Sequence, residues 1–283
     1  FTYATDLFDE PTIHTLGHRL QQILTTIATN PHTLIGDIDI LDKAEHFVTA
    51  TAKPAAPTPS ATTAGTALTQ ALVAAVEDDP DAPAIVCGDE ELTYHDLETR
   101  SSRLARVLIA RGCGPGAGVA MRLDRGIEAV VATWAVLKAG AAVVPVDALD
   151  AALPDELEIK VGLTMGSTRS SDAPDWLALD DPAVVAETAA ESPRPVTYTH
   201  RTGALRGSDP AFVGARTLSY DDLATAAEEL RTRAELTYES SILHQGDPKS
   251  SATLIELVAC GTVGAAIVLD GDGEVLEDEC VTG

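Results

Sequence analysis

The sequence predicts an α/β fold in which helices are layered against mostly parallel sheets. Short apolar segments alternate with helical segments of about ten to fifteen residues, as they do when parallel strands are joined by helices. Hydrophobic residues make up 45% of the 283 residues, which is enough for a substantial buried core. Aromatic residues make up only 4%, so small aliphatic side chains must fill most of that core.

The alternation is most regular in the first half of the expected core. Pro80 ends its first helix, and Gly140 caps the helix before its last strand. In chain order we expect helix, strand, turn, helix, strand, helix and strand over residues 66–80, 82–89, 91–97, 98–112, 116–123, 125–140 and 141–147.

The rest of the core is less regular in sequence. Residues 150–215 give no clear periodicity. After them we expect a helix over 219–236 and a helix–turn–strand unit over 253–272 that ends in an acidic, glycine-containing loop. We detect no internal repeat in the sequence.

The N-terminal segment is expected to form one strand and one helix. Residues 1–9 are extended in character, and residues 12–30 carry apolar side chains at three- and four-residue spacings. So small a piece cannot bury the apolar faces of both its strand and its helix. We therefore expect it to pack against the rest of the chain or a neighbouring domain. Residues 48–66 are rich in Ala, Thr and Pro, which predicts a linker and a domain boundary.

The charge excludes some classes of partner. The formal net charge is −25, from 44 acidic and 19 basic residues, and so acidic a surface repels phosphate backbones and anionic lipids. We therefore expect no nucleic-acid partner and no membrane partner. No apolar run approaches the roughly 20 residues that span a bilayer, and the first residues lack the features of a signal peptide.

The cysteines and histidines suggest no metal site. Cys87, Cys113, Cys260 and Cys280 lie far apart, so free thiols in a reducing compartment are expected. The pair formed by His14 and His18 lacks a third ligand nearby. Together with the absent signal features, the thiols predict a cytoplasmic protein.

Two segments resemble core motifs of amino-acid adenylation domains of nonribosomal peptide synthetases. LTYHDL at residues 92–97 is similar to the family's L-[TS]-Y-x-E-L, with Asp96 in place of Glu. LKAGAAVVPVD at 137–147 matches the family's L-K-A-G-x-A-Y-V-P-I-D in nine of eleven positions. The resemblance implies the N-terminal subdomains of the acyl-adenylating superfamily over residues 67–283.

The N-terminal segment resembles a different domain of the same enzymes. YATDLFD, the helix after it and PHTLIGDIDILDKAE are similar to the end of a condensation or heterocyclization domain. The resemblance therefore implies a condensation-domain tail at residues 1–47, followed by the linker at 48–66.

The family's phosphate loop is rich in Gly, Ser and Thr, whose backbone N–H groups and hydroxyls wrap the ATP phosphates. The resemblance places its counterpart at YTHRTGALRG, where His200 and Arg201 replace Ser and a flexible Gly. An arginine cannot adopt the glycine conformation cheaply, so we expect a relic loop; the alternative is a basic loop that still grips phosphate. The degenerate loop comprises Tyr198, Thr199, His200, Arg201, Thr202, Gly203, Arg206 and Gly207.

The family's substrate carboxylate also has no counterpart. Residues 236–269 align without gaps with the family's segment, and Glu256 falls on its Glu-Leu pair. The Phe-Asp pair that precedes it then falls on Ser250 and Ser251, and a serine cannot neutralise the substrate's ammonium. Asp247 would compensate only after a shift of the loop. The degenerate substrate site therefore comprises Ser250, Ser251 and Glu256.

The family also uses a Lys on a mobile C-terminal lobe, and the sequence up to Gly283 contains no counterpart of that lobe. The resemblance thus implies a catalytically inactive, shortened adenylation domain with no catalytic residue, metal or cofactor. It would be a platform between a condensation or heterocyclization domain and a peptidyl carrier domain loaded in trans, by analogy with bleomycin-like, thiazole-forming synthetases. Two alternatives stay open: an active domain that uses ATP and Mg²⁺, and a docking module for an MbtH-like protein.

Overall fold

The computed structural model describes residues 20, 64–147, 157–166 and 174–269. The chain divides into two compact units, Phe1–Thr58 and Pro59–Gly283. The expected condensation-domain tail apart from residue 20, most of the expected linker and the acidic loop at 270–272 lie outside the described residues. The second unit holds nearly all of the described residues.

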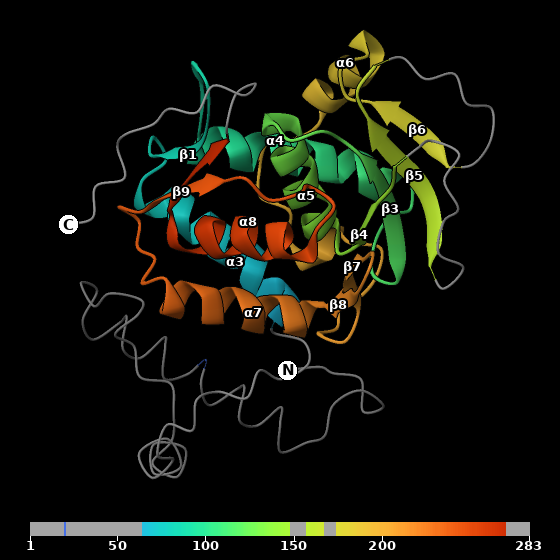
Figure 1. Ribbon diagram of the computed structural model, residues 1–283. Helices are drawn as coiled ribbons and strands as arrows, with labels where there is room; N and C mark the ends of the chain where they lie inside the picture. The colour runs from blue at the N-terminus through green and yellow to red at the C-terminus, as the bar shows by residue number, and fades with distance from the viewer. Residues whose placement is uncertain (1–19, 21–63, 148–156, 167–173, 270–283) are drawn as a thin grey trace. The chain divides into compact units, whose positions relative to one another are not determined.

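Two sheets form the framework of the second unit (Figure 1). A four-stranded sheet has the order β2-β1-β10-β9, and a six-stranded sheet has the order β6-β5-β3-β4-β7-β8. All neighbouring strands run parallel except the hairpins β1–β2 and β7–β8. The strands are β1 Pro83–Cys87, β2 Glu90–Thr93, β3 Ala117–Arg122, β4 Ala142–Pro145, β5 Glu158–Thr164, β6 Asp175–Ala178, β7 Pro210–Val213, β8 Thr217–Ser219, β9 Ser241–His244 and β10 Ala266–Leu269.

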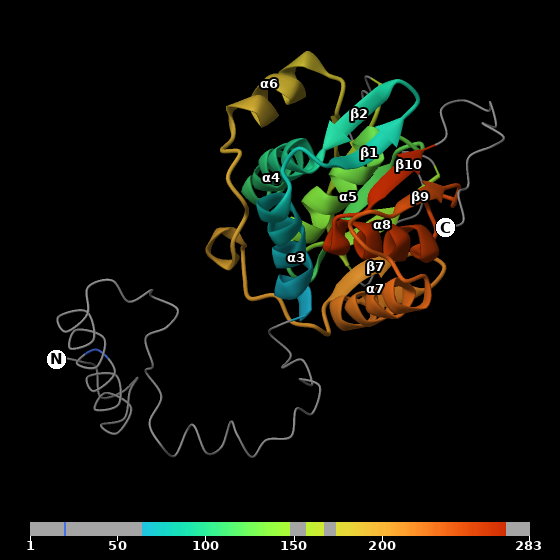
Figure 2. The same cartoon turned by 90° about the vertical axis from the view of Figure 1, so that its left-hand side faces the viewer.

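A layer of helices lies between the two sheets. α4 and α8 pack on the four-stranded sheet, α5 and α7 pack on the six-stranded sheet, and the pairs α4–α5 and α7–α8 pack on each other. Figure 2 shows α6 outside this layer, beside α4. The helices are α3 Ala64–Asp78, α4 Tyr94–Ala110, α5 Ile127–Ala139, α6 Pro182–Ala190, α7 Tyr220–Arg233 and α8 Ser251–Val263, with a short 3₁₀ helix η2 at Tyr198–His200.

The expected α/β fold with mostly parallel sheets is confirmed. The expected helices and strands between residues 66 and 147 are all present, but the turn expected over residues 91–97 is wrong: Glu90–Thr93 is strand β2, and α4 begins at Tyr94, four residues before the expected start at Glu98. The cause is a local cap: Thr93 accepts a hydrogen bond from the N–H of Asp96 at 3.1 Å and donates to its carboxylate at 2.9 Å. In the region that lacked periodicity, the structure adds β5, β6, α6 and β7.

The structure repeats one arrangement that the sequence does not reveal. Residues 83–145 and 210–269 each form a hairpin, a helix, a strand, a helix and a strand. The last strand of each half pairs with the first strand of the other, because β4 pairs with β7 and β10 pairs with β1. The two halves are therefore interlocked through both sheets.

Two buried tyrosines join the halves at equivalent places. Tyr94 begins α4 and donates to the carbonyls of Cys260 and Ala265, at 3.2 and 2.8 Å. Tyr220 begins α7 and donates to the carbonyls of Leu137 and Ala141, at 3.2 and 2.9 Å. Each hydroxyl thus satisfies carbonyls at the helix–strand turn of the opposite half.

Candidate functional site

Ligands of α/β proteins bind beyond the carboxyl ends of parallel strands, so these ends define where a site is expected. In this protein the carboxyl ends of strands from both sheets face one small cavity of about 30 Å³. Such a cavity holds a water or two, whereas small-molecule pockets usually measure about 300–1,000 Å³. Its walls include Met121, Val143, Phe212, His244, Leu257 and Leu269. We call this cavity the central cavity.

A buried imidazole lies in the wall of the central cavity. His244, at the carboxyl end of β9, is 3% exposed, and its Nδ1 lies 2.8 Å from a carboxylate oxygen of Glu256 on α8. Nearby, the hydroxyl of Thr253 donates to the carbonyl of Asp247 at 2.6 Å. These contacts fix the start of α8 against the end of β9.

The loop between β9 and α8 is tied across the strand ends. Arg125, just beyond β3, donates to the carbonyls of Gln245 and Gly246 at 3.0 and 3.2 Å. Lys249 forms an ion pair with Asp147, just beyond β4. The hydrogen bond to Asp147 raises the pKa of Lys249. The loop is thereby held beside the central cavity by residues that follow β3 and β4.

The predicted substrate residues lie at the start of α8. Ser250 is the N-cap of this helix: its hydroxyl accepts from the N–H of Ala252 at 3.2 Å, and its own N–H donates to the carbonyl of Asp247 at 2.8 Å. Ser251 is the first residue of the helix. Glu256 lies one turn further along and contacts His244. Ser250 therefore has a structural function, whatever residue occupies this position in relatives.

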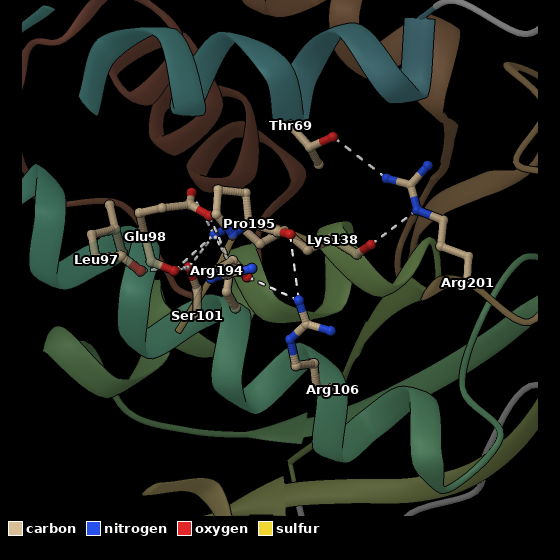
Figure 3. Close-up of polar contacts among 10 residues, drawn as sticks. Thr69, Leu97, Glu98, Ser101, Arg106, Lys138, Arg194, Pro195 and Arg201 are labelled. Carbon is tan, nitrogen blue, oxygen red and sulfur yellow. Dashed lines mark hydrogen bonds and ion pairs between the residues drawn. The ribbon is translucent and has the colours of Figure 1, made fainter. Parts of the chain in front are cut away.

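Within the predicted phosphate loop, Arg201 is turned into the protein. It is 9% exposed, its Nε donates to the main-chain carbonyl of Lys138 at 3.0 Å, and its Nη2 lies 3.4 Å from the hydroxyl of Thr69 (Figure 3). Burial lowers the pKa of Arg201. Its guanidinium thus satisfies a carbonyl at the C-terminus of α5, where the negative end of the helix dipole favours a cation.

The residues that precede Arg201 form a self-contained turn. Tyr198, Thr199 and His200 make up η2, and the ring Nδ1 of His200 bonds to the N–H and hydroxyl of Thr197, at 3.1 and 2.9 Å. Tyr198 is 75% exposed.

The residues that follow Arg201 lead into β7. Thr202, Gly203 and Arg206 are exposed, whereas Gly207 is buried and its carbonyl accepts a hydrogen bond from the N–H of Asp221 in α7 at 2.9 Å. A Cβ on Gly207 would come within 2.1 Å of the Asp221 carboxylate, so this position requires glycine for space.

The structure does not bring the predicted loop and the predicted substrate residues together. Residues 198–207 precede the amino end of β7, and β7 runs parallel to β4. The central cavity lies at the carboxyl ends of these strands. The predicted loop therefore lies toward the amino ends of these strands, whereas the predicted substrate residues lie toward their carboxyl ends.

A loop that the sequence reasoning missed does lie at the carboxyl edge. The hairpin between β7 and β8 turns at Gly214–Arg216, where the N–H of Gly214 donates to the carbonyl of Arg216 at 3.3 Å. A Cβ on Gly214 would lie 2.9 Å from the ring of Phe212 and 3.5 Å from Pro145. The signal that marks it is an apolar pair followed by glycine, in the segment PAFVGARTLS.

The lysine of the LKAG motif is buried in a polar cluster rather than placed at the central cavity (Figure 3). The ammonium of Lys138 lies 2.7 Å from a carboxylate oxygen of Glu98, 2.6 Å from the hydroxyl of Ser101 and 3.1 Å from that of Ser102. Burial lowers the pKa of Lys138 to about 8. The cluster joins α5 to α4, so in this protein the motif lysine stabilises the helix layer.

Other reactive groups in the described part of the chain are buried or dispersed. Burial raises the pKa of the Cys113 thiol to about 11 and that of Cys260 to about 12, so both thiols are poor nucleophiles. The described residues contain no group of three or more His, Cys, Asp or Glu side chains that could hold a metal ion. None of the helices described is long and apolar enough to cross a membrane.

The two interlocked sheets with helices between them, and the site at their carboxyl edges, define the class of protein. Residues 72–158 match the family model of AMP-binding enzymes. Among solved structures, the nonribosomal peptide synthetase FmoA3 in its AMPPNP-bound form superposes with a TM-score of 0.63 at 22% identity, over 93% of this chain and 29% of that chain. The N-terminal domain of FACL13 from Mycobacterium tuberculosis gives 0.60 at 19%, over 71% and 56%. The fold is that of the N-terminal subdomains of adenylating enzymes.

The sequence relatives narrow this class. An isonitrile lipopeptide synthase of Mycobacterium tuberculosis is 39% identical over 151 residues, which is 51% of this chain and 6% of that protein. CymA of Salinispora arenicola, a probable non-canonical nonribosomal peptide synthetase, is 30% identical over 96% of this chain and 4% of its own length. Novobiocin biosynthesis protein H of Streptomyces niveus is 32% identical over 80% of this chain and 40% of its own length.

This chain contains part of an adenylation domain of the nonribosomal peptide synthetase type. It spans less than half the length of each of these relatives. The resemblance found in the sequence is thereby confirmed for the adenylation domain.

Proposed function

We propose that this chain is a catalytically silent, shortened adenylation domain that acts as a platform between a condensation-type domain and a peptidyl carrier domain. The carrier would be loaded in trans by another adenylation domain. The module would be of the thiazole-forming type, and the protein would work in the cytoplasm.

The observation that carries this proposal is the state of the central cavity. Its volume of about 30 Å³ is too small for an amino acid. The loop above it is tied to both β3 and β4 by Arg125 and the Lys249–Asp147 pair. Among the described residues that line the cavity, none is a carboxylate that could pair with an ammonium, and Ser250 and Ser251 form the start of α8.

The position of Arg201 supports the same proposal. Its guanidinium is committed to the carbonyl of Lys138 at the end of α5. A loop that gripped phosphate would need this group free to face the nucleotide, and would need to lie at the carboxyl edge of the sheet. The loop at residues 198–207 has neither property.

The alternative is an active amino-acid-adenylating domain that uses ATP and Mg²⁺. It would require the β9–α8 loop to open, with Asp247 binding the substrate's ammonium. Opening would break the two hydrogen bonds from Arg125, each of which stabilises a protein by about 1–2 kcal/mol, and the exposed Lys249–Asp147 ion pair, which water screens. Because so few contacts hold the loop, a binding experiment can test this alternative.

Calorimetric titration with ATP and Mg²⁺, with and without a panel of amino acids that includes cysteine, decides between these functions. A silent platform gives no heat at millimolar nucleotide, with or without amino acid. Micromolar binding that one amino acid strengthens would refute the proposal. In that case the variants Arg206→Met and Asp247→Asn would show whether the loop at 198–207 or the β9–α8 loop carries the binding.

The choice of partner has its own test. A platform binds its carrier domain and its condensation-type domain, and both can be added as purified proteins. If the chain instead co-purifies with a small MbtH-like protein and binds neither domain, its role is that of a docking module.

A further inference from the structure

Four arginines lie along α4 and its C-terminal cap, at positions 100, 103, 106 and 111. Three of them have partners in the structure. Arg100 pairs with Glu128 on α5, and Arg111 forms a two-fold hydrogen bond with Glu187 on α6, with both distances 2.8 Å. Arg106 donates to the carbonyls of Ser192, Arg194 and Pro195, at 3.2, 3.0 and 3.4 Å.

Arg103 differs from its neighbours because no described residue gives it a hydrogen bond or an ion pair. Its Nε is fully buried and has no acceptor. A buried donor without an acceptor destabilises a fold, and acidic groups are abundant in a chain with 44 of them. A half-buried guanidinium whose Nε lacks an acceptor therefore calls for an explanation.

Arg103 lies in the wall of a pocket between α4, α5 and α6. This α4–α6 pocket has a volume of about 230 Å³. Its lining includes Arg100, Arg103, Leu104, Val131, Leu179 and Val184. Figure 2 shows α6 standing beside α4, and no residue of α6 is fully buried.

The charge of the α4–α6 pocket is opposite to that of the chain. Among its lining residues, Arg100 and Glu128 neutralise each other, which leaves the positive charge of Arg103. The rest of the lining is aliphatic apart from Thr188. The chain as a whole has a net charge of −25.

We propose that the α4–α6 pocket binds a small aliphatic carboxylate, with the guanidinium of Arg103 pairing with the carboxylate and the aliphatic tail lying against Val131, Leu179 and Val184. A planar guanidinium matches a carboxylate in two-fold geometry, and arginine is the usual residue for such recognition. The pocket is smaller than the roughly 300 Å³ of typical drug-sized sites, so a ligand of about five carbons fits it. Isovalerate has these properties, and so does the C-terminal carboxylate of a peptide that ends in leucine.

The binding can be measured on the full chain by ¹H–¹⁵N NMR at constant ionic strength. Isovalerate is titrated first, and isoamylamine, with the same tail and the opposite charge, is the matched control ligand. N-acetyl-Gly-Leu carries the same carboxylate and tail at a peptide terminus, so it distinguishes a peptide source from a free acid. The variants are Arg103→Met, which keeps the aliphatic stem, and Arg103→Lys, which keeps the charge but loses the planar fork. Arg122→Met, at an exposed arginine on β3, is the control variant.

With isovalerate or N-acetyl-Gly-Leu we expect saturable chemical-shift changes in the amides of α4, α5 and α6. The affinity should fall tenfold or more in Arg103→Met, fall less in Arg103→Lys and stay unchanged in Arg122→Met. Stronger binding of the peptide assigns the site to a peptide terminus, and stronger binding of isovalerate assigns it to a free acid. Shifts that do not saturate, or that isoamylamine reproduces on the wild-type chain, overturn the proposal. Saturation and the isoamylamine comparison are measured on the wild-type chain, so they test the proposal even if Arg103→Met fails to fold.

Discussion

The guanidinium of Arg201 donates to the main-chain carbonyl of Lys138 at 3.0 Å, and this contact joins the predicted phosphate loop to the end of α5 (Figure 3). The same lysine uses its side chain to bind Glu98 on α4. One residue of the LKAG motif thus connects the loop and two helices of the core.

Replacing Arg201 should therefore destabilise the fold. Arg201→Met removes a charged donor from a buried carbonyl, and we expect the free energy of unfolding to fall by about 1.5–3 kcal/mol. Urea unfolding measures this change. Arg206→Met is the matched control from the same loop, because Arg206 is exposed, and its effect should stay within about 0.5 kcal/mol. Equal effects of the two variants would contradict the structural function of Arg201.

Lys138 and Glu98 should be strongly coupled. Lys138→Met leaves the carboxylate of Glu98 buried without its cation, which should cost about 3–5 kcal/mol. The double variant Lys138→Met with Glu98→Gln should recover part of this loss, because it removes the unpaired charge. A double-mutant cycle from urea unfolding measures the coupling, and strictly additive losses would rule it out.

The same lysine makes stability depend on pH in a defined direction. Burial lowers the pKa of Lys138 to about 8, below the value of about 10.4 expected in the unfolded chain. Between these values the unfolded state binds more protons, so this group makes the free energy of unfolding rise as pH rises. We expect the difference in the free energy of unfolding between wild type and Lys138→Met to increase from pH 8 to pH 9.5. A difference that stays flat or decreases over that range would show that Lys138 is not shifted downward.

Tyr94 and Tyr220 should make similar contributions, because they occupy equivalent positions in the two halves. Tyr94→Phe and Tyr220→Phe each remove a hydroxyl that donates to two buried carbonyls, which should cost about 1–3 kcal/mol. Tyr238→Phe is the control, because that side chain is 74% exposed and should tolerate the change. Thermal unfolding compares the three, and a large effect of only one buried tyrosine would contradict the equivalence.

Restoring a carboxylate at the start of α8 tests the silent site directly. Ser251→Asp places a negative charge in the first turn of the helix, which should raise the free energy of unfolding by about 0.3–1 kcal/mol. We expect no amino-acid binding in calorimetry, because the central cavity remains too small and its loop remains tied. Amino-acid binding by this variant would show that the missing carboxylate alone keeps the site silent.

The sequence by itself determined the class of fold and most of its first half. The helix at 125–140, its glycine cap and the strand after it follow from apolar periodicity and from Gly140, whose φ of 85° suits a residue without a side chain. The adenylation resemblance also follows from these local motifs. Local patterns suffice here because helix ends and buried strands are specified by residues close together in the chain.

The tertiary structure decided how the distant parts meet. Strands β5 to β7 were not predicted, because their burial depends on neighbours such as β3 and β4 rather than on their own periodicity. Alignment located the degenerate phosphate loop and the substrate residues only by their order in the sequence. Parallel pairing of β4 and β7 puts the two sets toward opposite ends of the strands. The partners of Arg201 and the absence of any described partner for Arg103 are likewise set by packing between elements. Sequence spacing contains no information on such contacts, because they join residues that only the folded chain brings together.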